Sequence, residues 1–311
     1  MSQTFTVLSK DLYDEDADEP IEQSFIFHSD GAALLNGKGN YIADLRLPGM
    51  MDIAFLRSPI ARGRIRGIDT AAAKASEGVA FVATEEVLRS VGKMLPKASM
   101  ILHASEMAPE AYNMPSYGLL PVGGVHYEGE AVAAVVAKNR YLAEDAVDLI
   151  DVDFEEQRPV LDPEVSLAPG CEEIFEDVIA NKALEGTYGS KGDPAEFFDK
   201  AHLVIEQRYR MNRSGNPPLE TLGVVAKYEN RRLTVWSTIQ RPQMLRIALA
   251  DILSIPMARV QVIAPQNIGG GFGWKSPMYR ETAVVAWLAM QVGKPVRWIE
   301  DRTEALKNGI H

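Results

Sequence analysis

The 311-residue sequence contains a single cysteine, Cys171, and no long apolar run. One cysteine excludes an intrachain disulfide, and it also excludes an iron–sulfur cluster held by thiolates of this chain alone. No run of apolar residues is long enough to span a bilayer. The N-terminus also lacks the basic and then apolar segments of a secretory signal. We therefore expect a soluble cytoplasmic protein with no membrane insertion.

Basic residues and histidines are also few. The sequence has 32 Lys and Arg against 43 Asp and Glu, which gives a formal net charge of −11. This charge opposes broad contact with a phosphate backbone, so we expect no nucleic-acid partner. The five histidines do not have the spacing of metal ligands, and we assign no metal-ligating residue.

The length favours two domains, and the composition suggests where they meet. Residues 1–30 carry six acidic residues between Asp11 and Glu19 and predict an N-terminal acidic arm. Irregular stretches rich in proline, glycine and acidic residues lie between Pro159 and Pro194 and predict a linker. We therefore predict a first domain over residues 31–165 and a second over residues 166–311.

Apolar periodicity predicts the elements of both domains. In the first domain, strand 131–137, a helix from the N-cap Asn139 to about Leu149, and strand 151–155 resemble a βαβ unit. Glu128 and Glu130 alternate on a probable strand and are expected to be exposed. The other predicted elements are strands 51–56 and 79–84, a hairpin of 222–228 and 233–239, a helix from Pro242 to about Ile255, strand 259–264, a helix 277–291 capped by Ser276, and strand 296–299.

A glycine-rich loop, Asn267–Lys275, lies between a predicted strand and a predicted helix. Such a loop lets backbone N–H groups approach an anionic ligand without a Cβ in the way. Neither generic nucleotide motif fits, because Trp274 stands where each would need glycine. An ordinary nucleotide-binding α/β protein is therefore a weaker interpretation. Taken alone, the loop favours a different interpretation, a tight turn from strand to helix around a core Phe272.

A second motif changes that balance. Ser237–Pro242 reads Ser-Thr-Ile-Gln-Arg-Pro, and Gly269–Gly273, about thirty residues later, reads Gly-Gly-Gly-Phe-Gly. In this order the two motifs resemble the large, molybdopterin-binding subunit of the molybdenum hydroxylases, the family of xanthine dehydrogenase, aldehyde oxidase and carbon monoxide dehydrogenase. The resemblance covers nearly everything from about Gly31 onward. Further matching stretches are Gly39–Asp44, Leu47–Met50, Leu56–Pro59, Tyr127–Ala133, Pro218–Glu220 and Trp298–Arg302.

The resemblance implies an α+β fold, in which an α/β hammerhead-like domain precedes the first part of a molybdopterin-binding domain. It also implies which residues contact the cofactor: Gln240, Gly270, Gly271, Phe272 and Gly273. The alternative interpretation of Gln240 is an ordinary surface or turn residue that contacts no ligand.

The roles of two charged side chains near these motifs stay open. Lys275 could meet an anion or be solvated. Glu220 matches a family position near the active site, although a capping or salt-bridged carboxylate explains it equally well.

The family's subunit is more than twice as long as this chain, and the part that carries its catalytic base has no counterpart here. No catalytic residue is therefore assigned. The resemblance implies the N-terminal portion of a subunit that oxidises a small organic substrate with water as the oxygen source.

Several partners and cofactors follow from the same resemblance. They are a companion polypeptide that supplies the rest of the subunit, an iron–sulfur subunit and an FAD subunit. The cofactor would be molybdopterin, with its cytosine dinucleotide form left open, and the substrate is not specified. The alternative is a non-catalytic scaffold or degenerate paralogue in such a complex.

Overall fold

The computed structural model describes residues 31–91, 115, 118–183, 193–212 and 214–309. The acidic arm predicted for residues 1–30 lies outside the described residues. Contacts divide the chain into two units, Met1–Asn40 and Tyr41–His311. Within the first unit the structure describes the short helix α1 (Gly31–Leu35). All other elements described below belong to the second unit.

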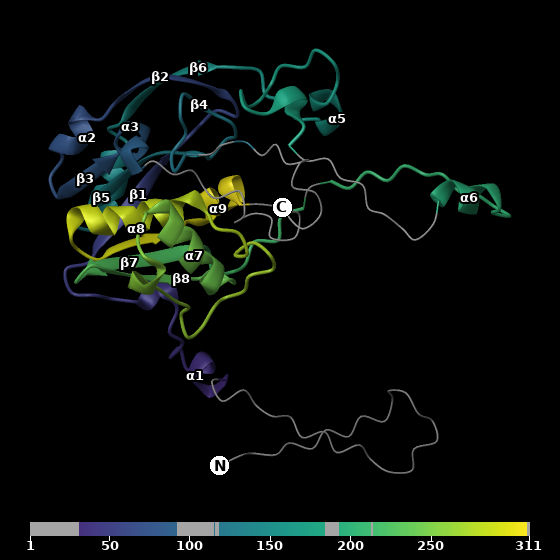
Figure 1. Cartoon of the computed structure of the whole chain (residues 1–311). Coiled ribbons are helices and arrows are strands. Elements are labelled where there is room, and N and C mark those ends of the chain that lie inside the picture. The colour runs from purple at the N-terminus through teal and green to yellow at the C-terminus, as the bar shows by residue number, and fades with distance from the viewer. Residues whose placement is uncertain (1–30, 92–114, 116–117, 184–192, 213, 310–311) are drawn as a thin grey trace, which may run out of the picture. The chain divides into compact units, whose positions relative to one another are not determined.

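The second unit is built on a seven-stranded sheet with the strand order β3-β5-β1-β10-β7-β8-β9 (Figure 1). Neighbouring strands are antiparallel except for the parallel pairs β1–β10 and β8–β9. The strands are β1 (Met51–Arg57), β3 (Val79–Ala83), β5 (Ala131–Ala137), β7 (Gly223–Glu229), β8 (Arg232–Ser237), β9 (Val260–Ile263) and β10 (Val296–Ile299).

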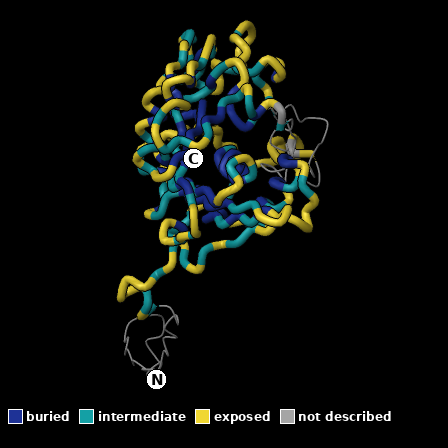
Figure 2. Tube along the Cα trace, turned by 90° about the vertical axis from the view of Figure 1, so that its left-hand side faces the viewer, coloured by how far each residue is buried: buried dark blue, intermediate teal, exposed yellow. Residues whose placement is uncertain are grey.

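Helices cover both faces of this sheet. One buried cluster joins the sheet to α7 and α8, and a second joins its other face to α2 and α4. Successive residues of β5 alternate between the two clusters, which explains why the all-apolar sequence of this strand is buried throughout. Figure 2 shows the buried residues in the interior of the unit. The helices are α2 (Ala71–Ala75), α4 (Arg140–Val147), α7 (Pro242–Ile252) and α8 (Arg280–Val292).

A smaller sheet has the order β4-β2-β6. Its strands are β2 (Gly63–Asp69), β4 (Gly124–Val125) and β6 (Asp151–Glu156). The remaining helices are α3 (Glu85–Leu88), α5 (Pro163–Ser166), α6 (Pro194–Asp199) and α9 (Arg302–Asn308), with short 3-10 turns at Ile42–Asp44, Arg89–Val91, Ile179–Asn181 and Met257–Arg259.

The structure confirms the mixed α and β class and most of the predicted elements, but the predicted βαβ unit is wrong. Strands β5 and β6 flank α4 as expected, yet they belong to different sheets. The reason lies in their composition. The apolar strand β5 can be buried on both faces, whereas four of the six residues of β6 are acidic. A strand with so many charges is suited to the edge of a small sheet.

Strands from both sides of the boundary predicted near residue 165 share the large sheet. Met51 and Asp52 of β1 pair with Val296 and Arg297 of β10. The Arg297 side chain also donates to the Asp52 carboxylate at 2.7 Å. The domain boundary near residue 165 stays a prediction. The two predicted segments do not form separate sheets, since both contribute strands to the large one.

Buried ion pairs also connect the segments on either side of the predicted boundary near residue 165. Arg280 at the start of α8 donates to Glu130 at 2.6 Å, and Arg57 of β1 forms ion pairs with Glu281 and Glu304. Burial lowers the pKa of Arg57, but the two carboxylates outweigh it and raise the pKa above its ordinary value. The expectation that Glu130 is exposed is wrong, because this side chain is fully buried against Arg280.

The buried pair Arg280–Glu130 gives a direct stability prediction. Arg280→Met leaves the buried carboxylate without its cation, and we expect the free energy of unfolding to fall by about 3–5 kcal/mol. The matched control is Arg140→Met, because Arg140 and Glu144 form a half-exposed pair. That change should cost less than about 1 kcal/mol. Urea titration of each variant measures both values, and equally small losses would contradict the prediction.

Candidate functional site

The glycine-rich loop Asn267–Lys275 connects β9 to α8 and has an unusual backbone. Gly270 and Gly273 have φ angles of +92° and +87°, which favour glycine, and Phe272 has a φ of +48°. A positive φ is uncommon for an aromatic residue and marks a position held by its surroundings. Phe272 as a residue is 68% exposed, so the interpretation of this residue as part of the core is wrong.

The loop extends further than the sequence predicts. Helix α8 begins at Arg280 rather than at residue 277, and its N-cap is Tyr279 rather than Ser276. The reason is local hydrogen bonding: the backbone N–H of Trp274 donates to the Gly271 carbonyl, and that of Ser276 donates to the Gly273 carbonyl. These bonds fold residues 271–276 into turns before the helix can start.

Gln240 lies directly against this loop. It follows β8 and precedes α7, and its backbone N–H donates to the Lys275 carbonyl at 2.8 Å. A Cβ added at Gly271 would lie 2.8 Å from the Gln240 Nε2 atom, closer than real contacts allow. Only glycine therefore fits at residue 271 with the Gln240 side chain in its place. The structure brings the two predicted motifs into contact.

Beneath the loop, Glu220 and Lys275 form an ion pair. The Lys275 Nζ and the backbone N–H of Gly269 both donate to the Glu220 Oε2, each at 2.8 Å. The interpretation of Lys275 as solvated is wrong, because its side chain is fully buried. Burial lowers the pKa of Lys275, while Glu220 opposes that shift. Glu220 is salt-bridged, which was one of its two interpretations.

Two further polar contacts hold the surroundings of the loop. The Asn216 amide donates to the Phe272 carbonyl, and the Arg302 guanidinium donates to the carbonyls of Pro218 and Leu219 at 2.7 and 2.9 Å. Sequence reasoning did not assign a role to Asn216 or to Arg302. Their partners lie more than 50 residues away along the chain, so no local pattern identifies them.

The C-terminal end of helix α9 packs against Trp274 of the loop. The Trp274 indole is buried, and a Cβ added at Gly309 would lie only 1.8 Å from an atom of its ring. Gly309 is the C-cap of α9, so the end of this helix packs closely against the indole. The Trp274 side chain is therefore held in place by the C-terminal end of α9.

Glu300, at the end of β10, is a buried carboxylate that sequence reasoning also missed. Its Oε2 accepts from the backbone N–H of Leu222 at 3.1 Å, and its Oε1 is buried with no hydrogen-bond partner among the described residues. Burial is the main cause that raises the pKa of Glu300 to about 7.

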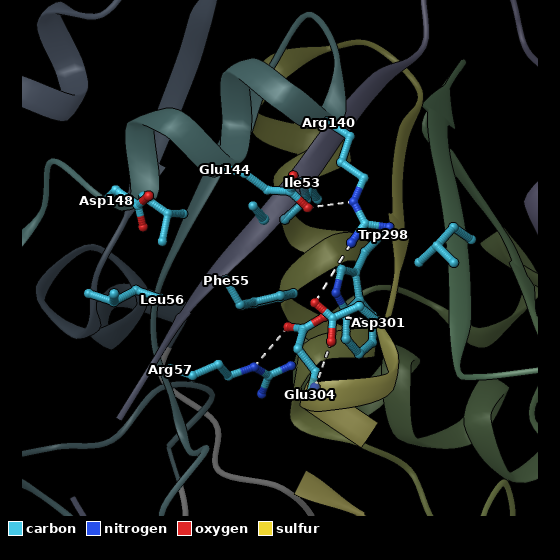
Figure 3. A pocket seen from close by; sticks show the side chains of 13 residues that line it. Ile53, Phe55, Leu56, Arg57, Arg140, Glu144, Asp148, Trp298, Asp301 and Glu304 are labelled. Carbon is cyan, nitrogen blue, oxygen red and sulfur yellow. Dashed lines mark hydrogen bonds and ion pairs between the residues drawn. The ribbon is translucent and has the colours of Figure 1, made fainter. Parts of the chain in front are cut away.

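A separate cavity of about 290 Å³ lies between β1, α4, β10 and α9 (Figure 3). Its two arginines pair with carboxylates of the same lining. Arg57 contacts Glu304, while Arg140 contacts Glu144 and lies 3.8 Å from Asp301. Because both arginines of the cavity are already paired with its carboxylates, we assign the cavity a structural role and place the candidate site at the loop.

Within the described residues, no group of three or more His, Cys, Asp or Glu side chains is arranged to hold a metal ion. None of the described helices has the length and apolar character that crossing a bilayer requires.

The sequence matches two protein families. Residues 36–158 match the aldehyde oxidase and xanthine dehydrogenase α/β hammerhead domain, and residues 175–311 match the molybdopterin cofactor-binding domain. The glycine-rich loop and Gln240 lie within the second match. The predicted order of the two domain types is therefore confirmed.

Individual relatives agree with these matches. The chain is 34% identical over 290 residues to the nicotine 6-hydroxylase large subunit of Paenarthrobacter nicotinovorans, covering 91% of this chain and 34% of that protein. It is 33% identical over 289 residues to the carbon monoxide dehydrogenase large chain of Hydrogenophaga pseudoflava, covering 88% of this chain and 34% of that protein.

Solved structures show the same fold. Quinoline 2-oxidoreductase from Pseudomonas putida 86 matches with a TM-score of 0.72 and 33% identity, over 90% of this chain and 34% of that one. Reconstituted carbon monoxide dehydrogenase from Oligotropha carboxidovorans matches with a TM-score of 0.76 and 33% identity, over 89% of this chain and 35% of that one. The chain thus spans about a third of the length of the relatives it matches.

The raised pKa of Glu300 predicts a pH dependence of stability. The carboxyl group has an ordinary pKa of 4.5 and a folded pKa of about 7, so the folded chain holds a proton that the unfolded chain has released. Stability therefore falls as pH rises through this window. Glu300→Gln removes the effect and keeps an acceptor for Leu222. Relative to this variant, the unmodified chain should lose about 2–3 kcal/mol between pH 5 and pH 8.

Urea titration of both chains at the two pH values measures this difference. Glu77→Gln, at an exposed position, is the matched control and should behave as the unmodified chain does. A constant difference between Glu300→Gln and the unmodified chain at both pH values would show that the carboxyl is not desolvated.

Proposed function

Because this chain belongs to the molybdenum hydroxylase large-subunit family and spans about a third of its relatives' length, we propose that it forms one wall of a molybdopterin site. The wall consists of Gln240 together with Gly270, Gly271, Phe272 and Gly273. The contact between the Gln240 side chain and the Gly271 backbone is the observation that carries this proposal.

The residues present fit such an anionic group. Among the described residues, the backbone N–H groups of Gly270, Gly271 and Phe272 have no hydrogen-bond acceptor. Gln240 is exposed and offers two amide N–H donors beside them. Consecutive free backbone donors in a glycine-rich turn suit a phosphate or metal-oxo ligand. The exposed Phe272 ring supplies an apolar surface at the same place.

When bound, the cofactor supplies the redox chemistry that this chain's side chains lack. The chain's own contribution is orientation. Glu220 and Lys275 hold the two ends of the loop, and Gln240 presents its amide to the space in front of Gly271. None of these groups is placed to act as a general base, so we assign that role to the remainder of the subunit.

The wider function follows the family. The complete subunit oxidises a small organic substrate with water as the oxygen source, in a cytoplasmic complex with iron–sulfur and FAD subunits. The form of the cofactor, molybdopterin or its cytosine dinucleotide, stays open. Relatives of similar identity are named for nicotine, for carbon monoxide and for quinoline, so identity alone selects no substrate.

Two substitutions test the proposed wall in the intact complex. Gln240→Ala removes the amide donors, and Gly271→Ala forces that amide aside, since the new Cβ would lie within 3 Å of it. Losing one hydrogen bond to a charged group costs about 1.5–3 kcal/mol, so we expect turnover to fall by roughly 10- to 100-fold. Molybdenum content per subunit is measured alongside turnover.

Gly67→Ala is the matched control, because a Cβ at that glycine meets no atom within 4 Å. It should leave both molybdenum content and turnover unchanged. If both wall variants retained full molybdenum content and full turnover, the proposed wall would be wrong. A complex that is active and intact but free of molybdenum would instead favour the scaffold alternative.

A further inference from the structure

The segment Leu203–Met211 exposes an unusual row of apolar side chains. It reads Leu-Val-Ile-Glu-Gln-Arg-Tyr-Arg-Met and follows α6, and Figure 1 shows it as a coil that runs from this helix toward the rest of the unit. At alternate positions, Leu203, Ile205, Tyr209 and Met211 are exposed by 72%, 78%, 81% and 93%, and the polar Gln207 lies between the two pairs. Exposed apolar side chains at a spacing of two are typical of a strand whose partner is missing.

Of the intervening positions, Arg208 and Arg210 contact the chain itself, whereas Val204 is exposed as well. Arg210 forms an ion pair with Asp162 at 2.8 Å, and Arg208 pairs with Glu164, so both arginines reach the N-terminus of α5. Arg208 and Arg210, which are two residues apart, thus contact the same short helix. An extended backbone puts these arginines on one face and the four apolar side chains on the opposite face.

The main chain of this segment is also free. Within the described part of the chain, no backbone hydrogen bond involves residues 203–211. A strand with unpaired N–H and C=O groups and an apolar face is a template for pairing with another strand. The backbone of the segment therefore has no pairing strand among the described residues, and its apolar side chains are not covered by them.

We infer that Leu203–Met211 is the strand on which the remaining part of the large subunit docks, by main-chain pairing and by covering the apolar face. The relatives are about three times as long as this chain, and the segment lies within the match to the cofactor-binding domain. The occupant is therefore a strand of the same subunit's remaining polypeptide. This inference rests on the proposed function, since it names the partner that completes the site.

Hydrogen exchange measured by mass spectrometry tests the docking strand. In the 311-residue chain alone, the amides of residues 203–211 should exchange at unprotected rates. In the assembled large subunit they should slow by at least about tenfold, because strand pairing withdraws them from water. Strand β8, paired on both sides, is the internal control and should be protected in both samples.

Substitution gives an independent test. Tyr209→Glu places a charge on the docking face and should weaken retention of the remaining polypeptide, co-expressed with this chain, by at least about tenfold. Tyr141→Glu is the matched control, since Tyr141 on α4 is 77% exposed, and it should assemble normally. Gln240→Ala should also assemble normally, so failure to dock is distinguishable from failure to bind the cofactor.

Two results would overturn the inference. One is unchanged fast exchange at residues 203–211 in the assembled subunit, together with normal assembly of Tyr209→Glu. The other is protection that appears in the 311-residue chain alone and grows with its concentration, because the strand would then pair with a second copy of this chain.

Discussion

The carboxylate of Glu220 is the interaction on which the candidate site depends. A single oxygen of this group accepts from the backbone at the start of the glycine-rich loop and from the lysine at its end. Lys275 in turn receives the backbone N–H of Gln240 on its carbonyl. One buried ion pair thus fixes the loop and the amide relative to each other. Breaking such a pair leaves an uncompensated buried charge, so the arrangement tolerates little change.

The rest of the fold holds this pair in place. Strand β10 leads into Glu300 and Arg302, and it pairs with β1 from the early part of the chain. Arg302 fixes the carbonyls just before Glu220, and α9 ends against the Trp274 indole. The hammerhead segment therefore contributes to the site indirectly, through a shared sheet and buried ion pairs, although none of the proposed cofactor contacts lies within it.

Local sequence patterns predicted much of the fold. They also identified the Gln240 motif and the glycine-rich loop, which lie in contact in the structure. The hairpin of β7 and β8, helix α7 and strand β10 depend on periodicity and turn residues, which are visible in a short window. The βαβ unit was wrong because the sheet to which β6 belongs is decided by its distant partner β2. Lys275 and Glu130 were misjudged for a similar reason. A charged residue type suggests exposure, and only a partner remote in sequence makes burial tolerable.

A structure of the assembled large subunit with molybdenum bound tests the proposed site most directly. We expect the pterin-held metal in front of Gly271, with the Gln240 Nε2 within hydrogen-bond distance of an oxygen ligand of the metal and backbone N–H groups of residues 270–272 facing the cofactor. A cofactor bound elsewhere, with Gln240 and Phe272 packed into a contact between polypeptides, would contradict the proposal.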